Sequence, residues 1–232
     1  MPVIGVTVDH TRDRTRYELS YDCVRAVVAG GGVPLLIPFD AGIDPAAVLG
    51  RVDGLLLSGG NDPDPAAWGE DWHPSCVPVD PTRETFERRL IAAAEARRTP
   101  TLGVCFGMQL MCITRGGSLH QFLPDLPDRD EHRRTGDDWT KRHDVAAAGL
   151  LGSIVGETCR VNTSHRQAVR AAGRGMAVCG TALDGTVEAV ADEKLPFWLG
   201  VQWHPERMPG EPAGWPLVAA LVDAARGATT SL

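Results

Sequence analysis

Residues 99–110 read T-P-T-L-G-V-C-F-G-M-Q-L and place Cys105 between two glycines. An apolar run precedes the cysteine and helix-forming residues follow it, so the pattern predicts a sharp turn from a strand into a helix. Gly103 and Gly107 would relieve crowding at such a turn. Because a helix N-terminus favours a thiolate, Cys105 is a candidate nucleophile. A small buried core residue is the other interpretation of a lone cysteine.

A second stretch supplies a candidate base. Residues 200–206 read G-V-Q-W-H-P-E at the end of an apolar strand. A thiol hydrolase needs a base and a group that orients it, and His204 and Glu206 are of these two types. They lie far from Cys105 in the sequence, so the fold would have to bring them together. A structural histidine and a solvated carboxylate are the alternatives for the separate residues.

The other histidines outside the 161–169 stretch show no spacing typical of metal ligands. His10, His73, His120, His132 and His143 are scattered along the chain. We therefore predict hydrogen-bonded or exposed histidines and no metal site.

The composition of the chain indicates which kind of partner it binds and in which cellular compartment it works. The chain has 232 residues and a formal net charge of −7. Scattered charges argue against a nucleic-acid surface and against a polybasic membrane patch, which leaves a small or uncharged partner. The six cysteines form no C-x-x-C pair, and residues 1–9 read as a first strand without a basic leader. We expect reduced thiols, no membrane span and a cytoplasmic protein.

Short apolar runs alternate with helical patterns through the first half of the chain. Such alternation predicts parallel strands joined by helical crossovers. The expected strands are residues 3–8, 33–37, 54–57 and 101–104, and the expected helices are residues 17–29, 82–98 and 106–114.

The second half is richer in strand patterns. Leu183, Asp184 and Gly185 predict a hairpin turn, and the charged stretch 125–141 predicts a surface loop. The expected strands are residues 159–162, 177–182, 186–190 and 198–203, with a terminal helix at 215–226. We predict one α/β domain spanning residues 1–232, with a mostly parallel sheet, helices on both faces and a small antiparallel addition.

Two of these motifs together resemble a known family pattern. Residues 103–109 and 204–206 are similar to the class I glutamine amidotransferase pattern, G-x-C-x-G-x-Q followed by H-P-E. Within that superfamily, longer stretches resemble the γ-glutamyl-γ-aminobutyrate hydrolase branch, and the resemblance runs from Val3 to Glu206. These stretches are residues 57–65, 68–70, 83–87, 116–121 and 161–169.

The resemblance implies a flavodoxin-like architecture and a set of roles. Cys105 would be the nucleophile, His204 the general base and then acid, and Glu206 the residue that orients His204. The N–H groups of Gly60 and Phe106 would form an oxyanion hole. Gln109, His165 and Gln167 would lie near the glutamyl group. The implied activity is hydrolysis of the γ-glutamyl amide bond of a small metabolite, without a metal or organic cofactor.

Three departures from the branch pattern concern substrate choice. Phe106 stands where the branch often has arginine, Glu84 where it usually has aspartate, and residues 162–167 read N-T-S-H-R-Q instead of N-S-x-H-H-Q. Hydrophobic residues at the position of Phe106 are common in ammonia-donating amidotransferases.

Two alternative functions stay open. One is a glutaminase subunit that passes ammonia to a synthase partner, and the other is a non-catalytic binding protein on the same fold. The amine portion of the substrate is also open: γ-aminobutyrate, a polyamine derivative, another amine or a peptide. The expected partner is a small γ-glutamyl substrate, with a homodimer as a further option.

Overall fold

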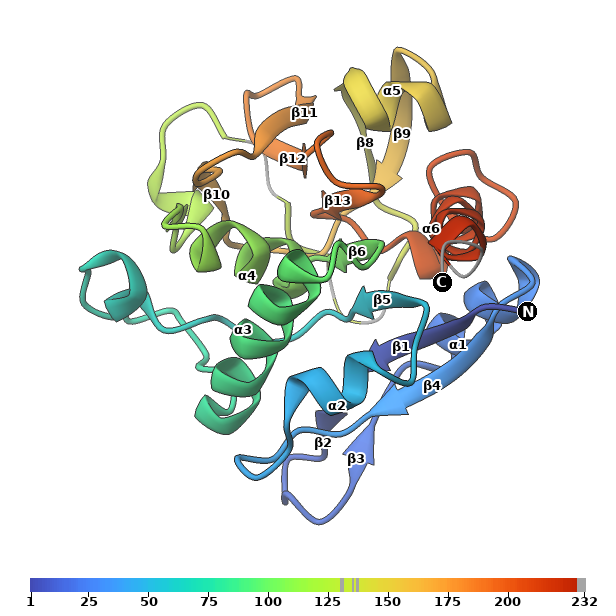
Figure 1. Cartoon of the computed structure of the whole chain (residues 1–232). Coiled ribbons are helices and arrows are strands. Elements are labelled where there is room, and N and C mark those ends of the chain that lie inside the picture. Colours follow the sequence, from blue (N-terminus) through green and yellow to red (C-terminus); the bar gives the residue numbers. More distant parts are fainter. Residues whose placement is uncertain (130–131, 135, 137, 229–232) are drawn as a thin grey trace.

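The computed structural model describes residues 1–129, 132–134, 136 and 138–228. Within these residues, 11 strands form one mixed sheet (Figure 1). Its first five strands, in the order β4-β1-β5-β6-β13, run parallel to one another. They are β4 (Val33–Ile37), β1 (Val3–Thr7), β5 (Gly54–Leu57), β6 (Thr101–Val104) and β13 (Trp198–Val201).

The sheet continues with antiparallel strands beyond β13, in the order β12-β11-β8-β9. Two short strands, β10 and β7, branch from β12. The bounds are β12 (Val187–Ala191), β11 (Ala177–Ala182), β8 (Arg142–Ala147), β9 (Thr158–Asn162), β10 (Ala168–Ala171) and β7 (Ser118–His120). The predicted fold class is therefore confirmed.

Helices cover both faces of the parallel part, as Figure 1 shows. Side chains alternate along a strand, so Leu56 of β5 joins one buried cluster and Leu55 and Leu57 join the other. The first cluster includes residues of α1 (Tyr21–Ala29), α5 (Gly149–Val155) and α6 (Trp215–Ala228). The second includes residues of α2 (Pro45–Leu49), α3 (Pro81–Ala96) and α4 (Phe106–Thr114).

Three 3₁₀ helices and a separate two-stranded sheet complete the described structure. They are η1 (Pro65–Trp68), η2 (Leu123–Asp125), η3 (Pro205–Arg207), β2 (Asp9–His10) and β3 (Tyr17–Glu18). The predicted helix at 17–29 is thus wrong over its first four residues. Ser20 caps the helix instead, because its side chain accepts a hydrogen bond from the Asp22 N–H.

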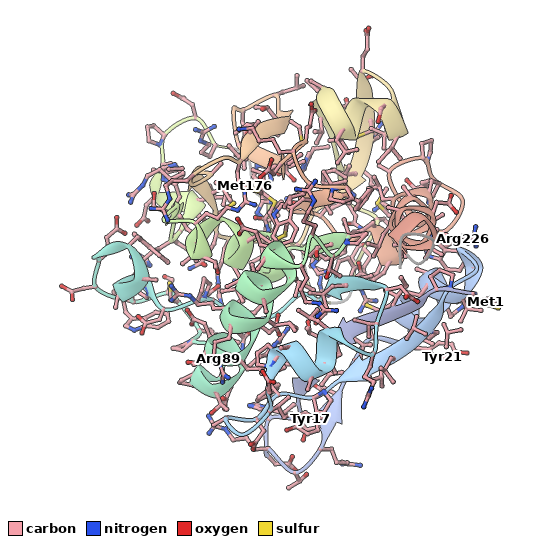
Figure 2. The ribbon with its side chains drawn as sticks, viewed as in Figure 1. Met1, Tyr17, Tyr21, Arg89, Met176 and Arg226 are labelled. Carbon is pink, nitrogen blue, oxygen red and sulfur yellow. The ribbon has the colours of Figure 1, made fainter. Side chains whose placement is uncertain are left out.

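One helix illustrates how differently two arginines of the same element can lie. Arg89 of α3 points outward at the surface (Figure 2) and is exposed. Arg83, further towards the N-terminus of α3, is fully buried. The helical pattern does not predict that Arg83 is buried. A buried arginine requires polar partners, and a pattern of apolar positions along one helix does not reveal them.

The predicted hairpin is confirmed: β11 ends at Ala182, β12 begins at Val187, and Gly185 between them has a φ of +82°. The predicted surface loop at 125–141 is wrong at His132, which is 2% exposed. Residues 130, 131, 135 and 137 of that stretch lie outside the described residues. All six cysteines are unpaired. Among the described residues, no helix combines the length and the apolar character that crossing a bilayer requires.

Candidate active site

Cys105 occupies the turn between β6 and α4. Its φ is +51° and its ψ is −105°, a backbone conformation that is strained for any residue with a Cβ. The Cys105 N–H donates to the carbonyl of Val201 in β13 at 2.8 Å. The sheet therefore holds the strained residue in place at the carboxyl end of β6.

The glycines on either side of Cys105 are required by close packing. A Cβ at Gly103 would lie 2.5 Å from the Met111 sulfur and 2.8 Å from the Met108 backbone nitrogen. A Cβ at Gly107 would lie 2.6 Å from the carbonyl oxygen of Leu57. Backbone atoms cannot move aside as a flexible side chain can, so Gly107 sets how closely α4 approaches β5.

His204 and Glu206 follow β13 and form a pair beside Cys105. The His204 Nδ1 lies 2.8 Å from the Glu206 Oε1. Burial by itself lowers the pKa of His204, but the Glu206 carboxylate and the interaction with Cys105 outweigh it and raise that pKa to about 10. The imidazole is therefore charged at neutral pH and can give a proton to a group that leaves beside Cys105.

Asn162 at the end of β9 holds the backbone of His204 from both sides. Its side-chain amide donates to the His204 carbonyl at 2.8 Å, and its Oδ1 accepts from the His204 N–H at 2.9 Å. The Trp139 ring stands edge-on to the imidazole at 5.0 Å. The antiparallel half of the sheet thus positions the histidine that the parallel half presents.

Two buried glutamines lie behind the thiol. Gln202 donates from its Nε2 towards the Cys105 sulfur at 3.4 Å, and its Oε1 accepts from the Gln109 Nε2 at 3.1 Å. The role of Gln202 as a donor to the thiol was missed, because in the sequence it looks like one more residue of the strand predicted at 198–203. Its position two residues before His204 is the signal that could have found it, since alternate residues of an extended chain share a face, although β13 itself ends at Val201.

Arg83 shapes the loop that follows β5. Its guanidinium donates to the Gly59 carbonyl at 2.9 Å and to the Ser58 hydroxyl at 3.1 Å. Glu87 and Asp9 each pair with it at 2.7 Å. A fixed Gly59 carbonyl also fixes the next peptide N–H, which belongs to Gly60, because the peptide unit is planar.

Phe106 and Glu84, two of the departures noted in the sequence, both point away from the thiol. The Phe106 ring is fully buried, and the Arg83 guanidinium lies 4.9 Å from its centroid. Glu84 accepts from the Asp64 N–H at 2.9 Å. Neither side chain lines a hollow beside Cys105.

A cavity of about 320 Å³ opens beside Cys105 and Gln109. Arg166 lines it and is held by Asp62, whose Oδ2 lies 3.0 Å from the Arg166 Nη2. Gln167 also lines it, and its Oε1 accepts no hydrogen bond from the described residues. The remaining lining residues are Gly60, Asn61, Arg133, Arg134, Gly136, Ser164 and His165.

A second hollow of about 600 Å³ lies on the His204 side of the same cysteine. It shares Cys105 and Gly60 with the smaller cavity, and Trp139 and Leu19 form part of its wall. The thiol therefore stands between two spaces, one beside the glutamines and one beside the histidine.

His165 differs from the other two residues expected near the glutamyl group. Gln109 and Gln167 line the smaller cavity through buried amides. The His165 ring is buried, and its Nε2 lies 3.3 Å from the Glu188 carboxylate. Its imidazole is thus engaged in another cluster, which also contains His132 and His143.

Comparisons with known proteins identify the family of this chain. The model of the family described as Peptidase C26 matches residues 2–206. The chain belongs to the Peptidase C26 family. It is 35% identical over 236 residues to a Mycobacterium tuberculosis protein named "Putative glutamine amidotransferase", covering 97% of this chain and 75% of that one.

A second sequence relative and a solved structure are also similar to this chain. A γ-glutamyl-γ-aminobutyrate hydrolase of Escherichia coli O157:H7 is 33% identical over 220 residues, covering 88% of this chain and 85% of the relative. The solved structure of the glutaminase domain of Trypanosoma brucei CTP synthase with bound acivicin superimposes with a TM-score of 0.68. It is 18% identical and covers 98% of this chain and 94% of that structure. The resemblance stated for the sequence is therefore confirmed at the level of the family and the fold.

Proposed function

We propose that this member of the Peptidase C26 family hydrolyses the γ-glutamyl amide bond of a small metabolite to glutamate and an amine. The larger hollow beside His204 is the observation that carries the proposal. An amine released near His204 needs room if it is larger than ammonia, and this hollow of about 600 Å³ offers it.

In the proposed mechanism, the Cys105 thiolate attacks the γ-carbonyl carbon of the substrate. A carbon–sulfur bond forms and the carbon–nitrogen bond breaks, while the His204 imidazolium transfers its proton to the departing amine. Water then attacks the thioester and gives a proton to His204, which frees glutamate and restores the thiolate. Glu206 keeps the imidazole oriented throughout.

The backbone N–H groups of Gly60 and Phe106 hold the oxyanion in this proposal. Arg83 supports it by fixing the Gly59 carbonyl at 2.9 Å, and the start of α4 supports it with unpaired N–H groups and the helix dipole. Gln109 and Gln167 lie near the glutamyl group. Gln167 would accept from the α-ammonium, because its Oε1 has no other partner among the described residues. His165 would act there only through its backbone.

The smaller cavity carries positive charge that suits the glutamyl α-carboxylate. Arg133, Arg134 and Arg166 line it, and a planar guanidinium matches a carboxylate in geometry. We assign the glutamyl group to this cavity and the amine portion to the larger hollow.

A glutaminase that donates ammonia is the second candidate. It is favoured by the structural likeness to the CTP synthase glutaminase domain at a TM-score of 0.68. A hydrophobic residue at the position of Phe106 is common in ammonia-donating amidotransferases. Here the Phe106 ring is fully buried and does not line the cavity, so it gives this candidate little support.

The test measures kcat/KM for the isolated chain on glutamine, γ-glutamyl-γ-aminobutyrate and γ-glutamylputrescine. We expect at least one γ-glutamyl amine to exceed glutamine, because only the amine portion can use the larger hollow. Preference for glutamine, or activity only with an added synthase, would overturn the hydrolase proposal in favour of the second candidate. The Cys105→Ala variant serves as the blank for contaminating hydrolases.

A further inference from the structure

Three imidazoles converge on one buried carboxylate outside the catalytic residues. Glu188 of β12 is fully buried. Its Oε1 lies 3.4 Å from His132 Nδ1, 3.3 Å from His143 Nε2 and 3.3 Å from His165 Nε2. His143 belongs to β8, whereas His132 and His165 come from segments that connect strands.

Outer hydrogen bonds determine which ring nitrogen of two histidines carries the proton. The His165 Nδ1 lies 2.9 Å from the Gln167 carbonyl, which can only accept, so this nitrogen carries a hydrogen. The His132 Nε2 lies 2.8 Å from the Asp184 carboxylate, which places a hydrogen there by the same argument. The His132 Nδ1 also lies 3.5 Å from the Thr163 hydroxyl, which donates its hydrogen to the His132 carbonyl at 2.6 Å. In each neutral ring, the other nitrogen therefore turns a lone pair towards Glu188. Lone pairs facing a carboxylate repel unless a cation lies between them.

The distances from the imidazole nitrogens to Glu188 match one edge of a metal coordination sphere. Around zinc, metal–ligand distances of about 2.0 Å place tetrahedral ligand atoms about 3.3 Å apart. The three nitrogen–oxygen separations of 3.3 to 3.4 Å agree with this edge. Within the described residues, His143 Nε2, His165 Nε2 and both Glu188 oxygens make no hydrogen bond of acceptable geometry. The ligand atoms of His132, His143 and Glu188 all lie within 4.8 Å of one another.

We propose that His132, His143 and Glu188 bind a divalent transition metal, zinc foremost, with the His165 ring beside them against Glu188. Imidazole nitrogens with one carboxylate suit zinc better than magnesium or calcium, which prefer oxygen ligands. Asp184 and the Gln167 carbonyl orient two of the rings, as outer partners do in metal sites.

We assign this metal a structural role, because the cluster lies apart from the catalytic residues and Glu188 and His132 are buried. It would tie the segment around His132 to β12, and the next two residues, Arg133 and Arg134, line the cavity beside Cys105. The Glu188 carbonyl accepts from the Gln202 N–H at 2.8 Å, so the site adjoins the strand behind the thiol. The proposal does not depend on the substrate of Cys105.

The test measures metal directly in protein purified without a histidine tag or chelator. We expect one zinc per chain by mass spectrometry of the metal, or one site in calorimetric titration of the stripped protein with Zn²⁺. Co²⁺ should give the visible absorption of a tetrahedral nitrogen–oxygen site. Zn²⁺ should also raise the Tm of the stripped wild type, because it binds the folded state.

Variants locate the site. His143→Ala and Glu188→Gln should abolish the stoichiometric binding, and Asp184→Asn should weaken it roughly 10–100-fold. His73→Ala is the matched histidine control, since His73 pairs with Asp125 elsewhere at 3.0 Å, and it should bind normally. Cys105→Ala should also bind normally, which separates this site from the catalytic thiol.

His143 is only partly buried, with 18% of its side chain exposed, so the His143→Ala variant should fold even if Glu188→Gln does not. The proposal is overturned if the folded wild type binds no Zn²⁺ at micromolar concentration. It is also overturned if folded His143→Ala binds as the wild type does. Protons, and not a metal, would then separate Glu188 from the histidines.

Discussion

The parallel and antiparallel halves of the sheet hold their active-site residues by different means. In the parallel half, steric fit holds Cys105: Gly103 and Gly107 leave no room for a Cβ beside Met111 and Leu57. In the antiparallel half, polar side chains are buried and paired, as with Asn162 on the His204 backbone. The turn around the nucleophile therefore tolerates almost no added volume, whereas the base and the cavity wall depend on charge and hydrogen bonding.

The largest expected effect is loss of the nucleophile. Cys105→Ala should lower kcat/KM by at least about 10⁴-fold, as removal of a catalytic nucleophile does elsewhere. Mass spectrometry of substrate-quenched wild type should find a glutamyl adduct on the Cys105 peptide. Cys112→Ala is the control. Burial raises the pKa of Cys112 to about 12, so this residue stays an unreactive thiol. The Cys112→Ala variant should therefore keep the activity of the wild type. Activity surviving Cys105→Ala would remove this residue from the mechanism.

One glycine-to-alanine substitution in each half of the sheet tests how much close packing contributes to activity. Gly107→Ala forces a methyl group to within 2.6 Å of the Leu57 carbonyl, so it should cost about 1–3 kcal/mol of unfolding free energy. The displaced turn should also lower kcat by about 10²-fold. Urea unfolding and steady-state kinetics measure both.

Gly185→Ala is the partner variant in the β11–β12 hairpin. Its φ of +82° predicts a loss of about 1–2 kcal/mol, but its new methyl group meets the flexible end of Arg129, so activity should persist. An equal loss of activity in Gly107→Ala and Gly185→Ala would contradict the view that close packing matters for activity only at the Cys105 turn.

Glu206→Gln tests the electrostatic side. The pKa of His204 is raised from 6.5 to about 10 in the folded protein. The His204–Glu206 pair therefore stabilises the folded state fully below about pH 6.5, and this stabilisation is lost as the pH rises through about 10. Glu206→Gln should cost about 1.5–3 kcal/mol near pH 6, the range for a hydrogen bond to a charged group, and much less near pH 10.5. Its kcat/KM should fall by less than about 10²-fold.

Denaturant unfolding of both proteins across this pH range measures the difference. Glu211→Gln is the control, because Glu211 pairs with Arg142 at 3.1 Å with 40% of its side chain exposed. A destabilisation by Glu206→Gln that does not change between pH 6 and pH 10.5 would contradict the raised pKa.

The smallest expected effect concerns the cavity wall. Arg166→Gln should raise KM about tenfold for glutamine and for γ-glutamyl-γ-aminobutyrate alike, with kcat little changed, if Arg166 contacts the glutamyl carboxylate. Arg170→Gln is the control, because Arg170 pairs with Glu70 at 2.6 Å and does not line the cavity. An increase confined to γ-glutamyl-γ-aminobutyrate would assign Arg166 to the amine portion instead.

Local patterns predicted the elements that present Cys105 and His204. The strands at 33–37, 54–57 and 101–104 and the helix at 106–114 agree with β4, β5, β6 and α4 residue for residue. These elements are bounded by glycine or proline and are strongly apolar, so the chain neighbours alone specify them. β8 and α5 were missed, because their alanine-rich and glycine-rich stretch at 146–152 shows neither strand nor helix periodicity.

The residue types and their order along the chain were enough to predict the strand-to-helix turn at Cys105 and to suggest a base at His204. They could not tell that Phe106 packs under Arg83, that Gln202 donates to the thiol, or that His132, His143 and His165 meet at Glu188. Hydrophobic periodicity indicates which side chains are buried, but it does not indicate which residues they contact in the interior. The cluster at Glu188 depends on the strand order β13-β12-β11-β8, which brings His143 to Glu188 across 45 positions of the chain.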